Sequence, residues 1–132
     1  MNCVFCNKYY ARDYEHIYSN DDGYDVMRFV PLNPVTSGHR LFVPTDHIEW
    51  GYCDAPYAIA SAVHFATSWG EGYESFNLIT SNGSAATQTI PHIHVHFVPR
   101  REGDGLHLPW TGQIKEVTWP YLEEDFEYLE DR

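Results

Sequence analysis

The segment from Pro91 to Pro99 places histidines at alternate positions, with one apolar residue after each of them. A β-strand points successive side chains to opposite faces, so we expect His92, His94 and His96 to share one face. The intervening residues are β-branched or aromatic and suit the other, half-buried face. Proline is tolerated at strand ends, so the two prolines are compatible with this strand. The segment therefore predicts a strand with an apolar face and a face of imidazoles.

Three interpretations of the imidazole face are open. A solvated face without chemistry is one, although clustered titratable groups more often mark a site. A metal site is the second, because His-x-His on a strand can chelate zinc. The third is a phosphate site in which one imidazole attacks the bound anion, because histidine acts as nucleophile, acid or base near neutral pH.

The flanks of the triad resemble the signature of the histidine triad (HIT) family of nucleotide hydrolases and transferases. Gln-Thr-Ile-Pro precedes the histidines and Pro-Arg follows them, as in that family. Further segments match the family's Gly-His strand pair and its small-residue loop: Asn33–Pro44, Asp46–His47 and Asn82–Ala86. The resemblance covers residues 1 to about 105, a length that suits one small domain.

Composition limits the possible partners. The 132 residues carry a formal net charge of −11, which argues against the basic surface that nucleic acids or anionic membranes require. A small phosphorylated ligand stays compatible with this charge, because a pocket can be locally positive. The sequence has no apolar run long enough to span a membrane and no signal peptide, so we expect a cytoplasmic protein. Its three cysteines are then thiols or metal ligands.

Hydrophobic patterns predict an α+β fold with five short antiparallel strands and one main helix. The expected strands are 16–19, 24–30, 39–43, 74–81 and the triad strand. A turn or short helix is expected over 8–15. The main helix is expected to begin after Asp54 and to end at Gly70 and Gly72. Its apolar stripe comprises Ile59, Ala62, Val63 and Ala66, with Phe65 and Trp69 beside it.

The sequence predicts a HIT domain over 1–105 and an acidic extension over 106–132 that packs on the same domain. A short helix or tail is expected from Pro120, with Leu122, Phe126 and Leu129 on one face. The antiparallel order of the strands predicts a five-stranded meander sheet. The resemblance adds that such domains often pair into a homodimer with a continuous sheet.

The resemblance also implies roles for residues of the triad and the preceding loop. His94 would be the nucleophile that forms a covalent nucleotidyl-histidine, and His96 would stabilise the phosphate oxygens. Thr89 would relay a proton to the leaving group, because a hydroxyl both donates and accepts. Asn82 and Gln88 would hydrogen-bond phosphate or leaving-group oxygens.

Two positions depart from the family pattern. Thr87 stands where glycine is usual, so its β-carbon would narrow the pocket or change the loop. Pro31 stands where Asp or Asn usually binds the ribose hydroxyls, and proline has no side-chain acceptor. Ribose binding is therefore weaker, shifted or absent. His39 matches the Gly-His pair and is expected to be structural.

Cys3 and Cys6 have the spacing of half a zinc knuckle. One branch of the family, largely bacterial, supplies two further ligands at the positions of His47 and His92. The resemblance therefore implies a closed, structural Zn²⁺ site without a position for water. The alternative is two buried thiols beside two unrelated histidines.

The sequence thus predicts a nucleotidyl hydrolase or transferase that acts on a nucleoside phosphoramidate or dinucleoside polyphosphate. The alternative is a zinc-stabilised nucleotide-binding or interaction module with little turnover. A DNA-end-processing relative is disfavoured by the negative charge.

Overall fold

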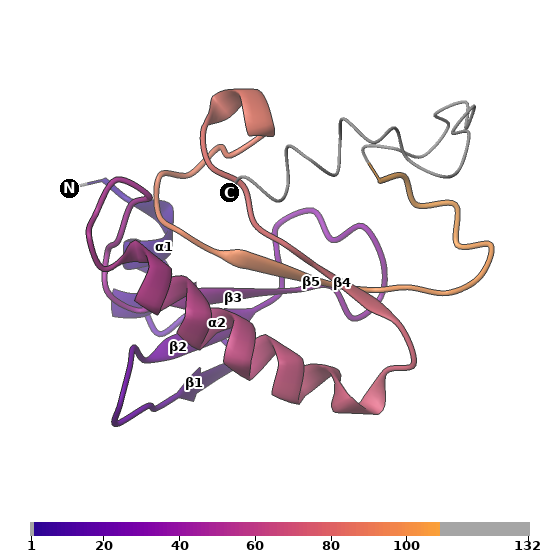
Figure 1. Ribbon diagram of the computed structural model, residues 1–132, viewed down its shortest axis with the longest axis horizontal. Coiled ribbons are helices and arrows are strands. Elements are labelled where there is room, and N and C mark those ends of the chain that lie inside the picture. The colour runs from indigo at the N-terminus through magenta and orange to yellow at the C-terminus, as the bar shows by residue number, and fades with distance from the viewer. Residues whose placement is uncertain (1, 109–132) are drawn as a thin grey trace, which may run out of the picture.

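An antiparallel sheet with one helix on each face forms the part of the chain that the computed structural model describes, residues 2–108 (Figure 1). The helices and strands are α1 (Val4–Tyr10), β1 (His16–Tyr18), β2 (Val26–Phe29), β3 (Arg40–Pro44), α2 (Ala55–Trp69), β4 (Phe76–Ile79) and β5 (Val95–Pro99). Short 3₁₀ turns, η1 (Gly70–Gly72) and η2 (Ser84–Ala86), lie on either side of β4. The expected helix or tail around Leu122, Phe126 and Leu129 and nearly all of the 106–132 extension lie outside the described residues.

The strand order is β1-β2-β3-β5-β4, with every neighbouring pair antiparallel. The predicted α+β class with five antiparallel strands is confirmed. The description as a meander holds only for β1 to β3. After β3 the chain passes through α2 to the far edge as β4, and β5 then returns between β3 and β4. His96 consequently lies opposite both Leu41 of β3 and Ile79 of β4, in the middle of the sheet.

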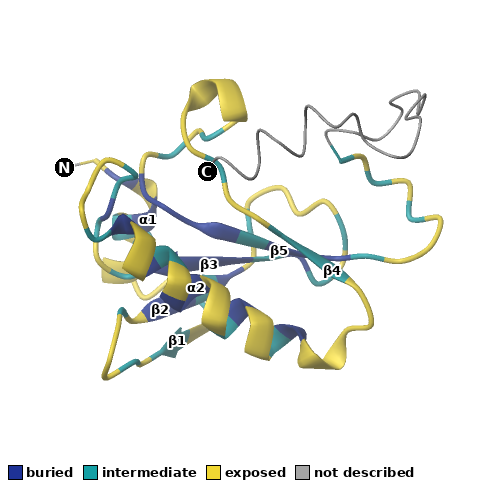
Figure 2. Cartoon of the chain, in the orientation of Figure 1, coloured by how far each residue is buried: buried dark blue, intermediate teal, exposed yellow. Residues whose placement is uncertain are grey.

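Both faces of the central strands are buried, which the half-buried pattern did not predict. Val26, Phe42, Val95 and Phe97 pack against α2, whereas Met27, Phe29, Leu41 and Val43 pack against α1. Figure 2 shows the result as dark blue central strands beneath an α2 whose outer side is yellow. Because α1 covers the second face, the imidazole face is enclosed at the end where α1 lies.

The helix α1 begins at Val4, so the expectation of a turn or short helix over 8–15 was wrong in position. Cys3 is its N-cap residue, but no side chain caps the helix. A seven-residue helix is too short to be stable alone, so its position depends on what it packs against.

The main helix is confirmed, with Asp54 at its N-cap and Gly70 at its C-cap. Gly70 has a φ of −75°, so conformation does not require glycine there. Space does, because a Cβ at this position would lie 2.8 Å from ring atoms of Phe76 and Phe97. Val63, predicted to lie in the apolar stripe, is 37% exposed. Within the described residues, no helix is long and apolar enough to cross a membrane.

Candidate functional site

The imidazole face of β5 opens into a pocket of about 310 Å³. Its lining includes His94, His96, Val98 and Arg100, which alternate along the chain as the strand period requires. Regular strand geometry begins only at Val95, so His92 and His94 precede β5. The remaining lining residues come from the segments before and after the sheet strands and from β4: Val35, His39, Asn77, Ile79, Ser81, Thr87, Gln88, Leu106, His107 and Leu108.

His94 is held in one tautomer. It is 8% exposed, and its Nδ1 lies 2.8 Å from the carbonyl oxygen of His92. A carbonyl only accepts, so Nδ1 carries the proton and Nε2 keeps its lone pair. Burial lowers the pKa of His94 below its ordinary value, although the hydrogen bond to the carbonyl opposes this. The neutral ring therefore presents an unprotonated nitrogen at neutral pH.

A second chain of hydrogen bonds fixes the tautomer of His96. The backbone N–H of Val35 donates to Nδ1 of His39 at 3.1 Å, so Nδ1 is an acceptor and Nε2 carries the proton. Nε2 of His39 then donates to Nδ1 of His96 over 2.9 Å. Neutral His96 must carry its own proton on Nε2. Burial, followed by the neighbouring His94 and His39, lowers the pKa of His96 to about 4.

The loop before the triad is braced by Gln88. Its Oε1 accepts from the N–H of Gly83 at 2.8 Å, and its Nε2 donates to the carbonyl of Ile90 at 3.1 Å. Gln88 lines the pocket, but these two bonds bind it to its own loop. Asn82 and Thr89 are exposed and are not among the residues lining this pocket. Thr89 instead lines a separate hollow beside Cys3 and His47.

Thr87 adopts the left-handed conformation, with a φ of 69°. This region is costly for a β-branched residue and natural for glycine, which agrees with the glycine usual in the family; the threonine of this chain has no structural explanation. We expect Thr87→Gly to stabilise the protein by up to about 1 kcal/mol, because relief of strain exceeds the extra entropy of glycine in the unfolded chain. Denaturant titration measures this change.

Thr89→Gly is the matched control for that substitution. Thr89 has no positive φ, so glycine there should destabilise the protein by about 0.5–1 kcal/mol. Equal destabilisation by both substitutions would contradict the strain at Thr87.

Pro31 is half-buried and is not among the residues lining the pocket. Within the described residues, the lining has no carboxylate. In the described part of the chain, the pocket therefore offers no acidic side chain to accept a hydrogen bond from a ribose hydroxyl.

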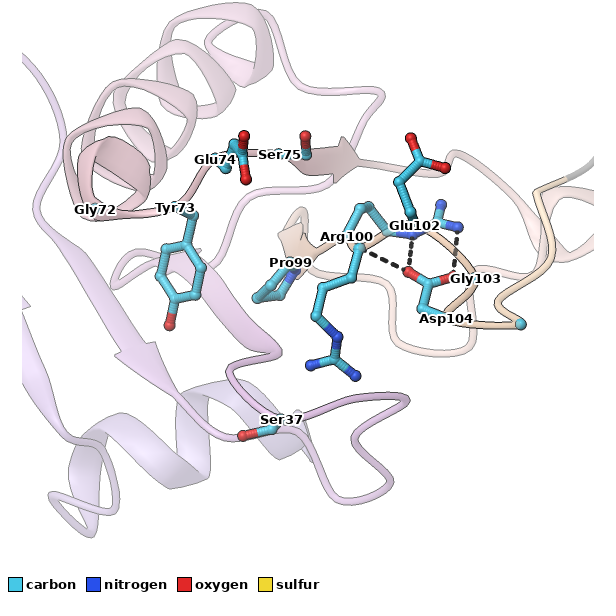
Figure 3. Close-up of a pocket in the computed structure, with 12 residues that line it drawn as sticks. Ser37, Gly72, Tyr73, Glu74, Ser75, Pro99, Arg100, Glu102, Gly103 and Asp104 are labelled. Carbon is cyan, nitrogen blue, oxygen red and sulfur yellow. Dashed lines mark hydrogen bonds and ion pairs between the residues drawn. The ribbon is translucent and has the colours of Figure 1, made fainter.

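A larger hollow of about 950 Å³ lies at the end of β5 and contains none of the triad (Figure 3). The dashed lines in Figure 3 mark hydrogen bonds to Asp104. The side chain of Arg100 donates to its carboxylate at 2.8 and 3.1 Å. Arg100 also donates to Asn77 and to the carbonyl of Leu106. Asp104, whose pKa is lowered first by its bond from Arg100, thus anchors the turn that brings Leu106 to the triad pocket.

The four predicted metal ligands come together. Ligand atoms of Cys3, Cys6, His47 and His92 all lie within 4.8 Å of one another. Sγ of Cys3 is 3.5 Å from Nδ1 of His92, and Sγ of Cys6 is 3.5 Å from Nδ1 of His47. Tetrahedral bonds of about 2.3 Å to sulfur and about 2.0 Å to nitrogen give an S···N separation of about 3.5 Å. The two S···N separations therefore match those of a zinc tetrahedron.

The outer ring nitrogens of both histidines are also engaged. Nε2 of His92 donates to the carbonyl of Pro44 at 2.8 Å, and Nε2 of His47 lies 2.9 Å from a carboxylate oxygen of Glu49. These bonds leave both Nδ1 lone pairs directed toward the thiols, which is the usual support for imidazole ligands of a metal. The residues therefore fit a structural zinc ion.

Comparisons with known proteins agree with this geometry. A family model described as HIT domain matches residues 13–103. Adenylylsulfatase HINT3 of Arabidopsis thaliana is 32% identical over 80% of this chain and 55% of its own length. Adenosine 5′-monophosphoramidase HNT1 of Saccharomyces cerevisiae is 27% identical over 76% of this chain and 60% of its own length. A Zn-bound histidine triad family protein from Mycobacterium smegmatis superposes with a TM-score of 0.66, at 29% identity over 82% of this chain and 81% of that one.

Proposed function

Because the chain belongs to the HIT domain family, we propose that it hydrolyses nucleotides at the α-phosphate through a covalent nucleotidyl-histidine on His94. The observation that carries this proposal is the hydrogen bond from Nδ1 of His94 to the carbonyl of His92, which leaves Nε2 free in a pocket. A neutral, oriented imidazole is the form of histidine that attacks phosphorus.

In the first step, Nε2 of His94 forms a bond to phosphorus while the bond to the leaving group breaks. For a phosphoramidate, the amine departs with the electron pair of the P–N bond and takes one proton. The His39–His96 pair supplies it after taking up one proton with the anionic substrate, whose charge opposes the effect of burial. The proton between the two rings moves to Nδ1 of His96, and His39 gains the new proton on its own Nδ1. Nε2 of His96 can then give its proton to the amine. In the second step, water attacks phosphorus, His96 takes up the released proton, and His94 leaves as a neutral ring.

The names of two relatives support the substrate class. One is an adenylylsulfatase and the other an adenosine 5′-monophosphoramidase. Both names refer to an adenosine 5′-phosphate group joined to a second group. The chain spans 55% and 60% of these relatives, and we propose the same class of AMP conjugate as the substrate here.

We assign Cys3, Cys6, His47 and His92 as ligands of a structural Zn²⁺. Such an ion would tie α1 to the segment after β3 and to the start of the triad. The relative with bound zinc supports this choice of metal. A homodimer in the cytoplasm stays a prediction from the sequence.

The test is release of AMP from adenosine 5′-phosphoramidate and from adenylyl sulfate by the purified protein. We expect multiple turnovers with at least one of them. If the protein binds AMP but turns over neither of these compounds nor diadenosine polyphosphates, a zinc-stabilised binding module replaces this proposal.

His39 should control the proton on His96. His39→Leu removes the N–H that donates to His96, so we expect kcat to fall about 10²-fold, within the usual range for acid–base groups. His39→Gln keeps an N–H donor and should recover at least part of the loss. Steady-state kinetics with thermal melts as a folding check measure both variants. Equal activity of His39→Leu and the wild type would contradict the proton chain.

A further inference from the structure

We infer that the zinc ligands and the nucleophile form one coupled unit, in which Phe5 and the backbone carbonyl of His92 are positioning groups for His94. This inference rests on the proposed function for its biological meaning. The contacts that carry it are independent of turnover.

His92 belongs to both sites at once. Its ring is fully buried, with Nδ1 facing the thiols of Cys3 and Cys6 at 3.5 and 3.7 Å and Nε2 donating to Pro44. Its own carbonyl accepts the Nδ1 proton of His94 at 2.8 Å. The same residue therefore offers a metal ligand with its side chain and orients the nucleophile with its backbone. A shift of the His92 backbone that withdraws the ring from the thiols would also displace the acceptor of His94.

Phe5 makes the second connection. It lies on α1 between the two cysteines and is 4% exposed. Its ring meets the ring of His94 edge-on, with centroids 5.0 Å apart, and the ring of His92 in the same way at 5.7 Å. Phe5 thus contacts both a residue of the ligand cluster and the nucleophile.

The position of Phe5 depends on α1, and α1 is weakly determined by its own sequence. The helix has seven residues, and no side chain caps its N-terminus. Ligation of Cys3 and Cys6 would fix its first turn and therefore the ring of Phe5. When zinc is bound to its four ligands, His94 should hold only the Nδ1–H tautomer. When zinc is removed, the ring of His94 should exchange between tautomers, and part of the population would present a protonated Nε2 that cannot attack.

The first test is ¹⁵N NMR of the histidine rings, with His94 assigned by its absence in His94→Asn. Zinc-loaded wild type should show a single Nδ1–H tautomer at His94. Zinc-loaded Phe5→Leu, which keeps an apolar side chain against the core, should show a mixture. Tyr10→Leu is the matched control, because Tyr10 lies on the same helix and is 79% exposed, and it should match the wild type. A single Nδ1–H tautomer in Phe5→Leu would overturn the role of Phe5.

The second test uses the reciprocity of binding equilibria. If zinc favours the tautomer with a lone pair on Nε2, a ligand that bonds to this nitrogen must favour zinc binding by the same factor. Orthovanadate with adenosine can accept a bond from Nε2 at vanadium, as phosphorus would. We expect saturating adenosine and orthovanadate to raise the affinity for zinc, measured by competition with a chromophoric chelator, by about fivefold or more. Phe5→Leu should reduce this factor toward one and Tyr10→Leu should preserve it. An unchanged zinc affinity in wild type that binds adenosine and orthovanadate would overturn the coupling.

The two proposals can fail separately. Loss of the Nδ1–H tautomer in Phe5→Leu without hydrolysis by the wild type would retain the coupling and reject the enzyme. Hydrolysis by the wild type, together with an unchanged tautomer in Phe5→Leu and an unchanged zinc affinity, would retain the enzyme and reject the coupling.

Discussion

Replacing His94 with asparagine is expected to lower AMP release from adenosine 5′-phosphoramidate by at least about 10⁴-fold, as for the loss of other enzymatic nucleophiles. Asparagine has no nitrogen lone pair that attacks phosphorus. In the unsubstituted protein the carbonyl of His92 accepts a hydrogen bond from Nδ1 of His94, and the asparagine amide can still donate to this carbonyl. The melting temperature should therefore move by less than about 5 °C. Steady-state kinetics and calorimetry on the same preparations measure both effects.

His64→Asn is the control, because His64 is an exposed histidine of α2 outside the pocket. It should retain the wild-type rate. Activity of His94→Asn within tenfold of the wild type would contradict covalent catalysis by His94.

Loss of zinc is expected to lower the melting temperature by about 10 °C or more, because structural zinc contributes directly to folding free energy. Cys6→Ser should have a similar effect, since it removes a thiol that faces both ligand histidines, at 3.5 Å from His47 and 3.7 Å from His92. The measurements are calorimetry before and after a chelator, with zinc restored, and the metal content of each sample.

Cys53→Ser is the matched control for the zinc prediction. Cys53 is exposed and lies outside the cluster, so its replacement should leave the melting temperature and the zinc content unchanged. Wild type that contains no zinc and does not respond to a chelator would favour the alternative of two buried thiols beside unrelated histidines.

Local patterns predicted the elements that are determined by nearby residues. The period of two placed His94 and His96 together on one pocket wall, and the period of 3.6 located α2 almost to the residue. The helix α1 was misplaced because its seven residues carry little helical signal and are held by Phe5 and Cys3 in the core. The return of β5 between β3 and β4 depends on pairing between distant segments, which no local pattern contains.

The candidate site shows the same division. The spacing of Cys3 and Cys6 indicated half of a metal site, and the resemblance supplied His47 and His92. The fold brings the four ligand atoms together. His39 was expected to be structural from its match to the Gly-His pair. Its bond to His96 joins residues 57 positions apart, which no local pattern contains. The location of Thr89 in a different hollow from the triad follows from the turn at Thr87 and the brace of Gln88. Its predicted role as a proton relay stays a prediction.

The most direct test of the central claim is the stereochemical course at phosphorus, measured with a P-chiral thiophosphoryl analogue of adenosine 5′-phosphoramidate hydrolysed in ¹⁸O-water. Attack by His94 followed by attack of water makes two in-line displacements, so we expect retention of configuration. Inversion would mean that water attacks the substrate directly, and it would contradict the covalent role of His94.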